Sequence, residues 1–340
     1  MVFLITGGTG LVGSFLLEKF AATPSLNESE CRVIVRNSES RLKVEKLGLT
    51  PIEADLNDIA SLKKAIKDVT SVIHLAARAD DWATWKDLYR VNVEGLENLV
   101  SVCRNANTDP FISHVSSTGV YGHYIPSTRV TETYRFNPTS IYQKSKYYQE
   151  KHLWELKEHE GWENFSLVRS PSIIGPRDTK TIGEIFKAVY EHKFPILRGG
   201  DMYATFIHPL DLSTALLLLD SNKSRSKGQA YNVRSFETKM TIFLEYIVKL
   251  VNPPKAPSPI NYRLVYTVAV LSELYSKISG RKTTLNRYRV TKFAKSRRYD
   301  DTKIKTELNF KPEKNMEITL DESYEWLTLH GIFPPKQNVD

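Results

Sequence analysis

Apolar runs of strand length alternate with amphipathic stretches of helical period through the first half of the chain. Residues 2–6 predict a buried strand, and residues 11–20 predict a helix because their apolar positions recur on one face. The alternation continues to residue 170 and predicts right-handed β-α-β units, hence a parallel sheet with helices on both faces. The other strands are predicted at residues 31–35, 50–54, 71–76, 111–116 and 165–170, and the other helices at 59–67, 89–105 and 141–158.

The second half of the chain is less regular. A proline-rich loop at residues 255–259 precedes an apolar helical stretch at 260–278, and the tail at 300–331 predicts two helices separated by a turn at Pro312. The whole pattern predicts an α/β protein with a doubly wound parallel sheet. The remaining helices are predicted at residues 182–192, 211–220 and 240–251, and the remaining strands at 205–208 and 229–233.

Glycines cluster directly after the first predicted strand, in the sequence TGGTGLVG at residues 6–13. Gly7 permits a tight turn, Gly10 lets the backbone approach a pyrophosphate, and Gly13 lets the helix pack closely on the strand. The N–H groups at the helix start then point at the phosphates. The position between a strand and a helix favours a dinucleotide site over a glycine turn without a ligand. The predicted contacts are Gly7, Thr9, Gly10, Leu11, Val12 and Gly13 of a Rossmann-type fold.

The second predicted strand ends in Arg36, where NAD-preferring sites usually carry an acidic side chain. A carboxylate would repel a ribose 2′-phosphate, whereas a guanidinium pairs with it. The sequence therefore predicts NADP(H) as the preferred cofactor. The alternative is a surface arginine with NAD(H) held by other contacts. Asp55, followed by Leu56, either reaches the adenine amino group or caps the next helix.

Tyr142 and Lys146 stand four residues apart in the pattern YxxxK. On a helix this spacing places both side chains on one face, so the ammonium favours the phenolate and lowers the pKa of Tyr142. A tyrosine so adjusted exchanges a proton with an alcohol near neutral pH. Upstream, Ser116 and Ser117 end a strand, where a hydroxyl can hold a substrate oxygen. The alternatives are a solvated helix face and a Ser/Thr/Gly turn.

Composition excludes several classes of function. The chain has 340 residues and a formal net charge of +8, which favours anionic partners. Two cysteines and no HExxH spacing predict neither a disulfide framework nor a metal site. The basic region at residues 281–298 lacks a recognised nucleic-acid module, so no nucleic-acid partner is predicted. With neither a signal peptide nor an apolar run of about 20 residues, a cytoplasmic protein is expected.

In order and spacing, these motifs resemble the extended short-chain dehydrogenase/reductase family over nearly the whole chain. HLAA at residues 74–77, VNVEG at 91–95 and GP at 175–176 add to the match. The resemblance implies that Tyr142 is the acid/base and that Lys146 also binds the nicotinamide ribose. Ser117 is preferred over Ser116 because it stands four residues before the tyrosine of VYG. The implied catalytic tetrad is Asn92, Ser117, Tyr142 and Lys146, and further cofactor contacts are implied for Leu75, Ala76, Ala77, Pro171 and Ile173.

The same resemblance implies a division into domains. Residues 1–170 would form the dinucleotide-binding domain, with return segments near 205–235. Residues 171–204 and 236–335 would form a smaller, discontinuous substrate domain. Three features are similar to the 3β-hydroxysteroid dehydrogenase-like branch, namely DWATW at 81–85, the apolar stretch at 260–278 and LNRYRV at 285–290. They imply a hydrophobic substrate that is steroid-like, a ketoacid or flavonoid-like.

Other functions remain as alternatives. Nucleotide-sugar epimerases and dehydratases share the cofactor machinery, but this chain lacks an acid at residues 117–119 and has Ser172 where sugar epimerases tend to carry asparagine. A non-catalytic NADP(H)-binding protein would usually lack part of the tyrosine–lysine pair. The stretch at 260–278 is either a lid that also touches a membrane surface or an ordinary core helix. Helices at 91–105 and 142–158 often pair in this family, so a homodimer is expected.

Overall fold

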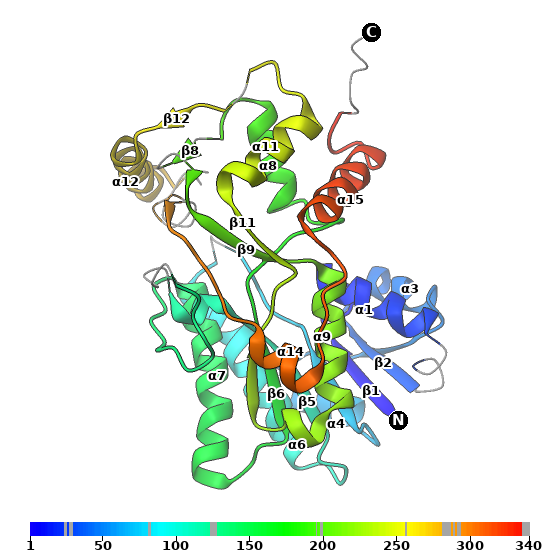
Figure 1. Ribbon diagram of the computed structural model, residues 1–340. Helices are drawn as coiled ribbons and strands as arrows, with labels where there is room; N and C mark the ends of the chain where they lie inside the picture. The colour runs from blue at the N-terminus through cyan, green and yellow to red at the C-terminus, as the bar shows by residue number, and fades with distance from the viewer. Residues whose placement is uncertain are drawn as a thin grey trace.

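Seven parallel strands form the central sheet of the computed structural model (Figure 1). Their spatial order is β10-β6-β5-β4-β1-β2-β3, so the chain winds outward from β1 in one direction and from β4 in the other. A ligand crevice lies at the carboxyl ends of the strands where such a sheet reverses. The predicted doubly wound sheet is confirmed. The strands are β1 (Val2–Thr6), β2 (Glu30–Val35), β3 (Thr50–Glu53), β4 (Ser71–His74), β5 (Phe111–Ser117), β6 (Phe165–Ser170) and β10 (Gln229–Asn232).

Helices cover both faces of this sheet because its strands are apolar on both sides. Ile5 of β1 points into one hydrophobic cluster and Leu4 into the other, as the alternation of a strand requires. Each fully buried aliphatic side chain stabilises the fold by about 1.5–3 kcal/mol. The first cluster includes residues of α1 (Leu11–Ala22), α9 (Pro209–Ser221) and α14 (Thr302–Leu308), and the second includes residues of α4 (Ile59–Ala65), α6 (Gly95–Arg104) and α7 (Ile141–Glu160).

The structure describes residues 1–23, 26, 30–80, 83–122, 128–194, 196–197, 200–255, 257–280, 287, 290 and 294–334. A three-stranded sheet of order β11-β9-β7 lies beyond the carboxyl edge of the large one (Figure 1). Three helices, α8, α11 and α15, share a third hydrophobic cluster there. These elements are β7 (Ser172–Ile173), α8 (Ile182–Tyr190), β9 (Tyr203–Ile207), β11 (Phe236–Lys239), α11 (Met240–Val251) and α15 (Met316–Leu329), and the short ones are α3 (Ser38–Glu45), η2 (Thr118–Tyr121), β8 (Ile196–Leu197), α10 (Lys223–Ser226) and β12 (Pro259–Ile260).

The chain crosses between the two sheets more than once. After β9 it enters α9, which packs against α1, where Ser213 Oγ donates to the carbonyl of Val12 at 3.3 Å. β10 then pairs with β6 at the edge of the large sheet, and β11 pairs with β9. The carboxyl ends of β5 and β6 therefore face the base of the smaller sheet, as Figure 1 shows.

The predicted helix at residues 89–105 is interrupted. The chain forms α5 (Trp85–Leu88), a π-helix η1 (Tyr89–Glu94) and then α6. Asn92 of η1 is fully buried. Its side-chain amide accepts from the backbone N–H of Arg78 at 2.7 Å and donates to the backbone carbonyl of Arg78 at 3.1 Å. Its backbone carbonyl accepts from Gln149 Nε2 at 2.6 Å. A π-turn places an additional residue in the helix. These contacts hold Asn92 in place. They come from Arg78 and Gln149, which lie in other segments of the chain, so the hydrophobic pattern of this helix alone could not predict them.

Helix α12 (Tyr262–Ser279) does not fit the interpretation of an ordinary core helix. Of its described residues, Val265 and Ala269 are buried, whereas Leu264, Leu271 and Ile278 are 61%, 59% and 87% exposed. That interpretation is therefore wrong for its outward side. No helix in the described part of the chain is long and apolar enough to cross a bilayer. The cytoplasmic location stays a prediction.

A buried ion pair joins the end of β6 to α7. Arg169 and Glu150 are 2% and 0% exposed, and the guanidinium binds both carboxylate oxygens at 2.7–3.1 Å. Arg169 also donates to the phenol of Tyr121 at 2.9 Å, and Ser116 Oγ donates to Glu150. A buried charge is tolerated only when such contacts satisfy it, so the pair fixes α7 against the sheet.

Removing one member of this pair is expected to be costly. Arg169→Met leaves the Glu150 carboxylate buried without its cation and should lower the free energy of unfolding by about 3–5 kcal/mol. Arg41 pairs with Glu45 and Glu53 at 3.8 Å on the surface, so Arg41→Met should change it by less than about 1 kcal/mol. Urea denaturation of both variants measures the difference. Equal losses would contradict this account of the buried pair.

Candidate active site

The glycine turn lies against the segment that follows β4. Gly7 has φ of +70°, and a Cβ there would stand 2.7 Å from Ala76 N and 2.9 Å from the carbonyl carbon of Leu75. A Cβ on Gly13 would stand 2.3 Å from the carbonyl oxygen of Gly7. Side chains at these two positions would push the turn away from its neighbours. Leu75 and Ala76, two of the predicted cofactor contacts, therefore border the turn directly, and Ala77 follows them at the surface.

The N-terminus of α1 is open to an anion. Its cap is Gly10, which offers no side chain to the first N–H groups, and the first turn carries no acidic residue. A Cβ on Gly10 would meet only the Gly7 carbonyl, at 3.2 Å. Helix N-termini with exposed N–H groups bind phosphates. Thr9 and Gly10 are exposed and Leu11 is half-buried, whereas the side chain of Val12 is buried and leaves only its backbone for such a contact.

The carboxyl ends of β1 and β4 are fastened together by Thr6. Its hydroxyl lies 2.7 Å from His74 Nδ1 and accepts from the N–H of Ala76 at 3.2 Å, while its carbonyl accepts from the N–H of Leu75 at 3.1 Å. Sequence reasoning missed this positioning role of Thr6 and His74. The sequence does show a threonine as the last residue of the first strand. Its contact with His74 could be inferred only once β4 was known to be the neighbour of β1.

Arg36 stands directly after β2 with an exposed side chain. The next residue, Asn37, caps α3 by accepting from the N–H of Ser40 at 2.9 Å. The guanidinium therefore lies at the carboxyl edge of the sheet, beside the start of a helix. That is the edge to which Gly7 and Gly10 also belong.

Asp55 does not cap the next helix, so that alternative is wrong. The cap of α4 is Asp58, which accepts from the N–H of Ala60 at 3.0 Å. Asp55 is exposed and accepts from the N–H of Asn57 at 2.8 Å. Leu56 is 9% exposed, and a Cβ on Gly95 would stand 3.2 Å from its Cβ. The side chain of Leu56 thus belongs to the core, where a bulkier residue in place of Gly95 would displace it.

The YxxxK pair opens α7. Ser140 and Gln143 form a capping box, which starts the helix at Ile141 and places the half-buried Tyr142 in its first turn. Lys146 follows one turn later, 3% exposed, and its Nζ donates to the carbonyl of Val115 in β5 at 3.0 Å. Burial lowers the pKa of Lys146 to about 8, although Glu150 opposes this shift.

Asn92 reaches the same helix from η1. Its Nδ2 donates at 2.9 Å to the hydroxyl of Ser145, the residue before Lys146. The amide is already committed to Ser145 and to the backbone of Arg78. The structure therefore brings Asn92 to α7 as a residue that holds the helix in position.

The two serines at the end of β5 differ in their surroundings. Ser116 is buried and bound to Glu150. Ser117 is half-buried, caps η2 by accepting from the N–H of Gly119 at 3.0 Å, and lies in register with Ser170 of β6. A Cβ on Gly119 would stand 3.0 Å from the side chain of Gln143, so η2, which follows β5 directly, abuts the first turn of α7.

Pro171 and Ile173 continue the chain from β6 into β7. Pro171 is buried, and its carbonyl accepts from Ser170 Oγ at 3.1 Å. Ile173 is half-buried and pairs with Ile207 of β9. This short segment therefore spans the two sheets at the carboxyl edge of β6.

The comparison with protein families decides which class of protein this is. The sequence model of the NAD dependent epimerase/dehydratase family matches residues 3–233. This chain belongs to that family. The expected membership of the extended short-chain dehydrogenase/reductases is confirmed, and the chain is an NAD(P)-dependent enzyme of this extended type.

Named relatives of this family member cover most of its length. The decarboxylating sterol-4-alpha-carboxylate 3-dehydrogenase of Dictyostelium discoideum is 24% identical over 291 residues, which are 81% of this chain and 85% of that protein. A putative dihydroflavonol 4-reductase of Synechocystis is 23% identical over 337 residues, 97% of this chain and 95% of that protein. The crystal structure of UDP-glucuronic acid 4-epimerase from Bacillus cereus in complex with NAD has a TM-score of 0.75 at 18% identity, covering 97% of this chain and 99% of that chain.

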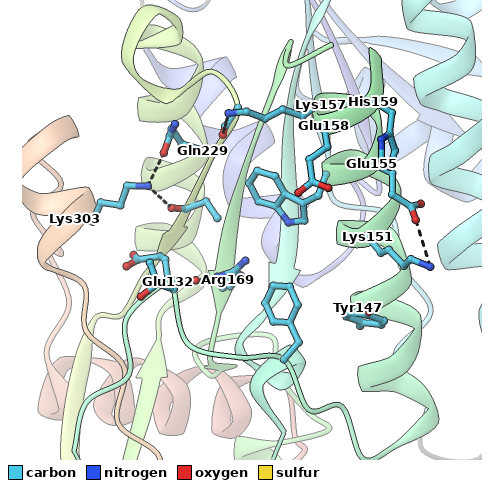
Figure 2. Close-up of a pocket in the computed structure, with 15 residues that line it drawn as sticks. Glu132, Tyr147, Lys151, Glu155, Lys157, Glu158, His159, Arg169, Gln229 and Lys303 are labelled. Carbon is cyan, nitrogen blue, oxygen red and sulfur yellow. Dashed lines mark hydrogen bonds and ion pairs between the residues drawn. The ribbon is translucent and has the colours of Figure 1, made fainter. Parts of the chain in front are cut away.

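The cavity shown in Figure 2 lies apart from the candidate catalytic residues of this family member. It has a volume of about 610 Å³ and runs beside the later turns of α7, where Lys151 pairs with Glu155 at 3.4 Å. On its far side Lys303 donates to Gln229 and to the carbonyl of Ala230. Ser117, Tyr142 and Lys146 are not among its described lining residues. No group of three metal-ligating side chains occurs among the residues that the structure describes.

Two buried imidazoles lie in register beneath this site. His74 of β4 and His114 of β5 stack with ring centroids 5.2 Å apart. Burial, together with the charge of Lys146, lowers the pKa of His74 to about 3 and that of His114 well below its usual range. Both rings are therefore neutral near pH 7, and Lys146 carries the positive charge at this position.

These histidines predict a pH-dependent stability. Below pH 6.5 these histidines bind protons in the unfolded chain, whereas in the folded protein their imidazoles stay neutral. The free energy of unfolding should therefore fall as the pH falls from 6.5 toward 3. Each such histidine contributes a slope of about 1.4 kcal/mol per pH unit. Urea denaturation of His114→Asn between pH 6.5 and 5 should show a shallower slope, while the exposed control His159→Asn should match the unmodified protein. Equal slopes in the two variants would refute this account.

Proposed function

We propose that this enzyme transfers a hydride between NADP(H) and the carbonyl or alcohol carbon of a hydrophobic substrate, with Tyr142 as the acid/base. The observation that carries the proposal is the position of Lys146. Its buried ammonium lies one turn from Tyr142 and is bound to β5 two residues before Ser117. All three residues therefore belong to one junction between α7 and β5, at the carboxyl edge that also carries the glycine turn.

Each residue has a part in the proposed reaction. The ammonium of Lys146 and the positive end of the α7 dipole both favour the phenolate of Tyr142. During reduction the phenol of Tyr142 donates its proton to the substrate oxygen, and during oxidation the phenolate accepts it. The hydroxyl of Ser117 holds that oxygen, and Asn92 positions α7 through Ser145. The nicotinamide supplies or accepts the hydride when it is bound.

The cofactor contacts are proposed along the same edge. The backbone of Gly7, Thr9, Gly10, Leu11, Val12 and Gly13 would hold the pyrophosphate. Arg36 would pair with the ribose 2′-phosphate, and Asp55 would reach the adenine. Lys146 would bind the nicotinamide ribose. Backbone contacts from Leu75, Ala76, Ala77, Leu56, Pro171 and Ile173 would complete the site.

The substrate domain is proposed to comprise residues 171–204 and 236–335, above the carboxyl edge of β5 and β6 (Figure 1). Relatives named for a sterol carboxylate and for dihydroflavonol support a hydrophobic substrate. A nucleotide sugar is the second candidate substrate, because the UDP-glucuronic acid 4-epimerase of Bacillus cereus shares this fold and binds NAD. Thr118 and Gly119 offer no acid beside Ser117, which favours the hydrophobic substrate. A homodimer through α6 and α7 is also proposed.

Tyr142→Phe is expected to abolish most turnover. Removal of the phenol oxygen should lower kcat about 10²–10⁴-fold with little change in NADPH affinity, because the proton donor is lost. Tyr148→Phe, on an exposed tyrosine of the same helix, is the matched control and should retain activity. NADPH oxidation with a panel of hydrophobic ketones and UDP-sugars measures both. Full activity of Tyr142→Phe would exclude the proposed acid/base, and turnover confined to UDP-sugars would favour the second candidate.

Arg36→Asp should reverse the cofactor preference. A carboxylate repels the 2′-phosphate, and the loss of one charge-assisted pair should lower the ratio of kcat/KM for NADPH over NADH about tenfold or more. Lys227→Asp makes the same change in net charge at an exposed lysine between α10 and β10 and should leave the ratio unchanged. An identical ratio in Arg36→Asp and in the unmodified enzyme would disprove the proposed role of Arg36.

A further inference from the structure

One side of α12 presents a continuous row of exposed apolar side chains. Leu264, Val268, Leu271, Tyr275 and Ile278 are 61%, 46%, 59%, 52% and 87% exposed. They follow one another at intervals of four and three residues, which places them along one side of a helix. We call these five residues the α12 apolar face. Single exposed apolar residues are ordinary, but a row along a whole helix marks an interaction surface.

The opposite side of α12 anchors the helix to the protein. Val265 and Ala269 are buried in a small cluster with Met202, Val290 and Ala294. The core contacts of the helix are thus made from that side, and the α12 apolar face is turned away from them. Figure 1 shows α12 at the outer margin of the upper part of the molecule.

The charged residues of α12 and of the sequence that follows it are mostly positive. Arg263 and Lys277 of α12 are exposed, while Glu273 is neutralised by Arg287 at 2.7 Å. The sequence that follows, residues 281–298, contains eight lysines and arginines and no acidic residue. The formal net charge of the whole chain is +8. An apolar helix face with cationic neighbours is complementary to an anionic lipid surface.

We propose that the α12 apolar face docks on the surface of an anionic lipid bilayer. The helix would lie in the plane of the interface, with the five apolar side chains among the acyl chains and with Arg263 and Lys277 at the headgroups. Spanning is excluded for α12, because Arg263, Glu273 and Lys277 interrupt it and no described helix meets the length and apolarity of a span. The proposal concerns binding alone and does not depend on the reaction proposed above.

A second copy of the chain is a less suitable occupant. In an antiparallel pair of α12 helices packed through this face, Arg263 of one copy would lie near Lys277 of the other. Like charges brought together at an interface are repulsive. An anionic surface instead gains from the same two cations.

The test is co-sedimentation of the full-length protein with phosphatidylcholine vesicles that contain or lack phosphatidylserine. We expect binding to the anionic vesicles only, and less of it as the ionic strength rises. The double variant Leu264→Ser/Leu271→Ser should lower the partition coefficient about tenfold or more, because two apolar anchors are lost. Arg263→Gln/Lys277→Gln should lower it as well, since each cation contributes near the surface.

The matched control is Ile242→Ser/Leu329→Ser, which makes the same kind of change at side chains 49% and 75% exposed on α11 and α15. This variant should bind the anionic vesicles like the unmodified protein. No binding to anionic vesicles, or an equal loss in the control, overturns the proposal. The proposal is also overturned if the protein does not bind vesicles but is a dimer in sedimentation velocity, and if only Leu264→Ser/Leu271→Ser dissociates that dimer.

Discussion

The candidate site depends on a lysine ammonium that is held away from water and that forms no ion pair with the residues the structure describes. Lys146 is 3% exposed and binds the carbonyl of Val115, so its charge acts through a medium of low dielectric, where its influence on a neighbouring phenol is strongest. Glu150 stands four residues later on α7, at the spacing where helical ion pairs form. Its carboxylate is instead taken by Arg169, Ser116 and Trp154. The buried pair that fixes α7 to the sheet thus also leaves the charge of Lys146 available to Tyr142.

The glycine turn and the tyrosine helix reach the same edge of the sheet by different physical means. At the turn, the absence of side chains is decisive, because Gly7 and Gly13 touch backbone where a Cβ has no room. Helix α7 is instead held in position by side-chain contacts, since Lys146 binds β5 and Asn92 binds Ser145. Thr6 links the two regions through β4, whose neighbour β5 carries Ser117. Hydrophobic clusters on both faces of the sheet keep these strands in register.

The sequence predicted the features that depend on local pattern. The seven strands of the large sheet appear as apolar runs, and the glycine turn and YxxxK each lie within a few residues, so their geometry follows from the element that carries them. It did not predict the π-helix at Asn92, whose contacts come from residues 78 and 149, or the network of Glu150, Arg169 and Tyr121, which joins three elements. Asp55 was open as a cap because local pattern could not distinguish it from Asp58. The sequence also left undecided whether α12 is exposed or buried. The pattern of an apolar helix is the same whether the helix packs against protein, lipid or substrate.

The most direct test of the central claim is a crystal structure of the enzyme with NADP⁺ and a bound alcohol or ketone. We expect the phenol oxygen of Tyr142 and the hydroxyl of Ser117 both to lie within about 2.6–3.2 Å of the substrate oxygen. The reacting carbon should then lie about 3–3.5 Å from C4 of the nicotinamide, with the ammonium of Lys146 beneath the ribose. A complex in which the phenol of Tyr142 points to bulk solvent, or in which the dinucleotide lies away from Gly7 and Gly10, would contradict it.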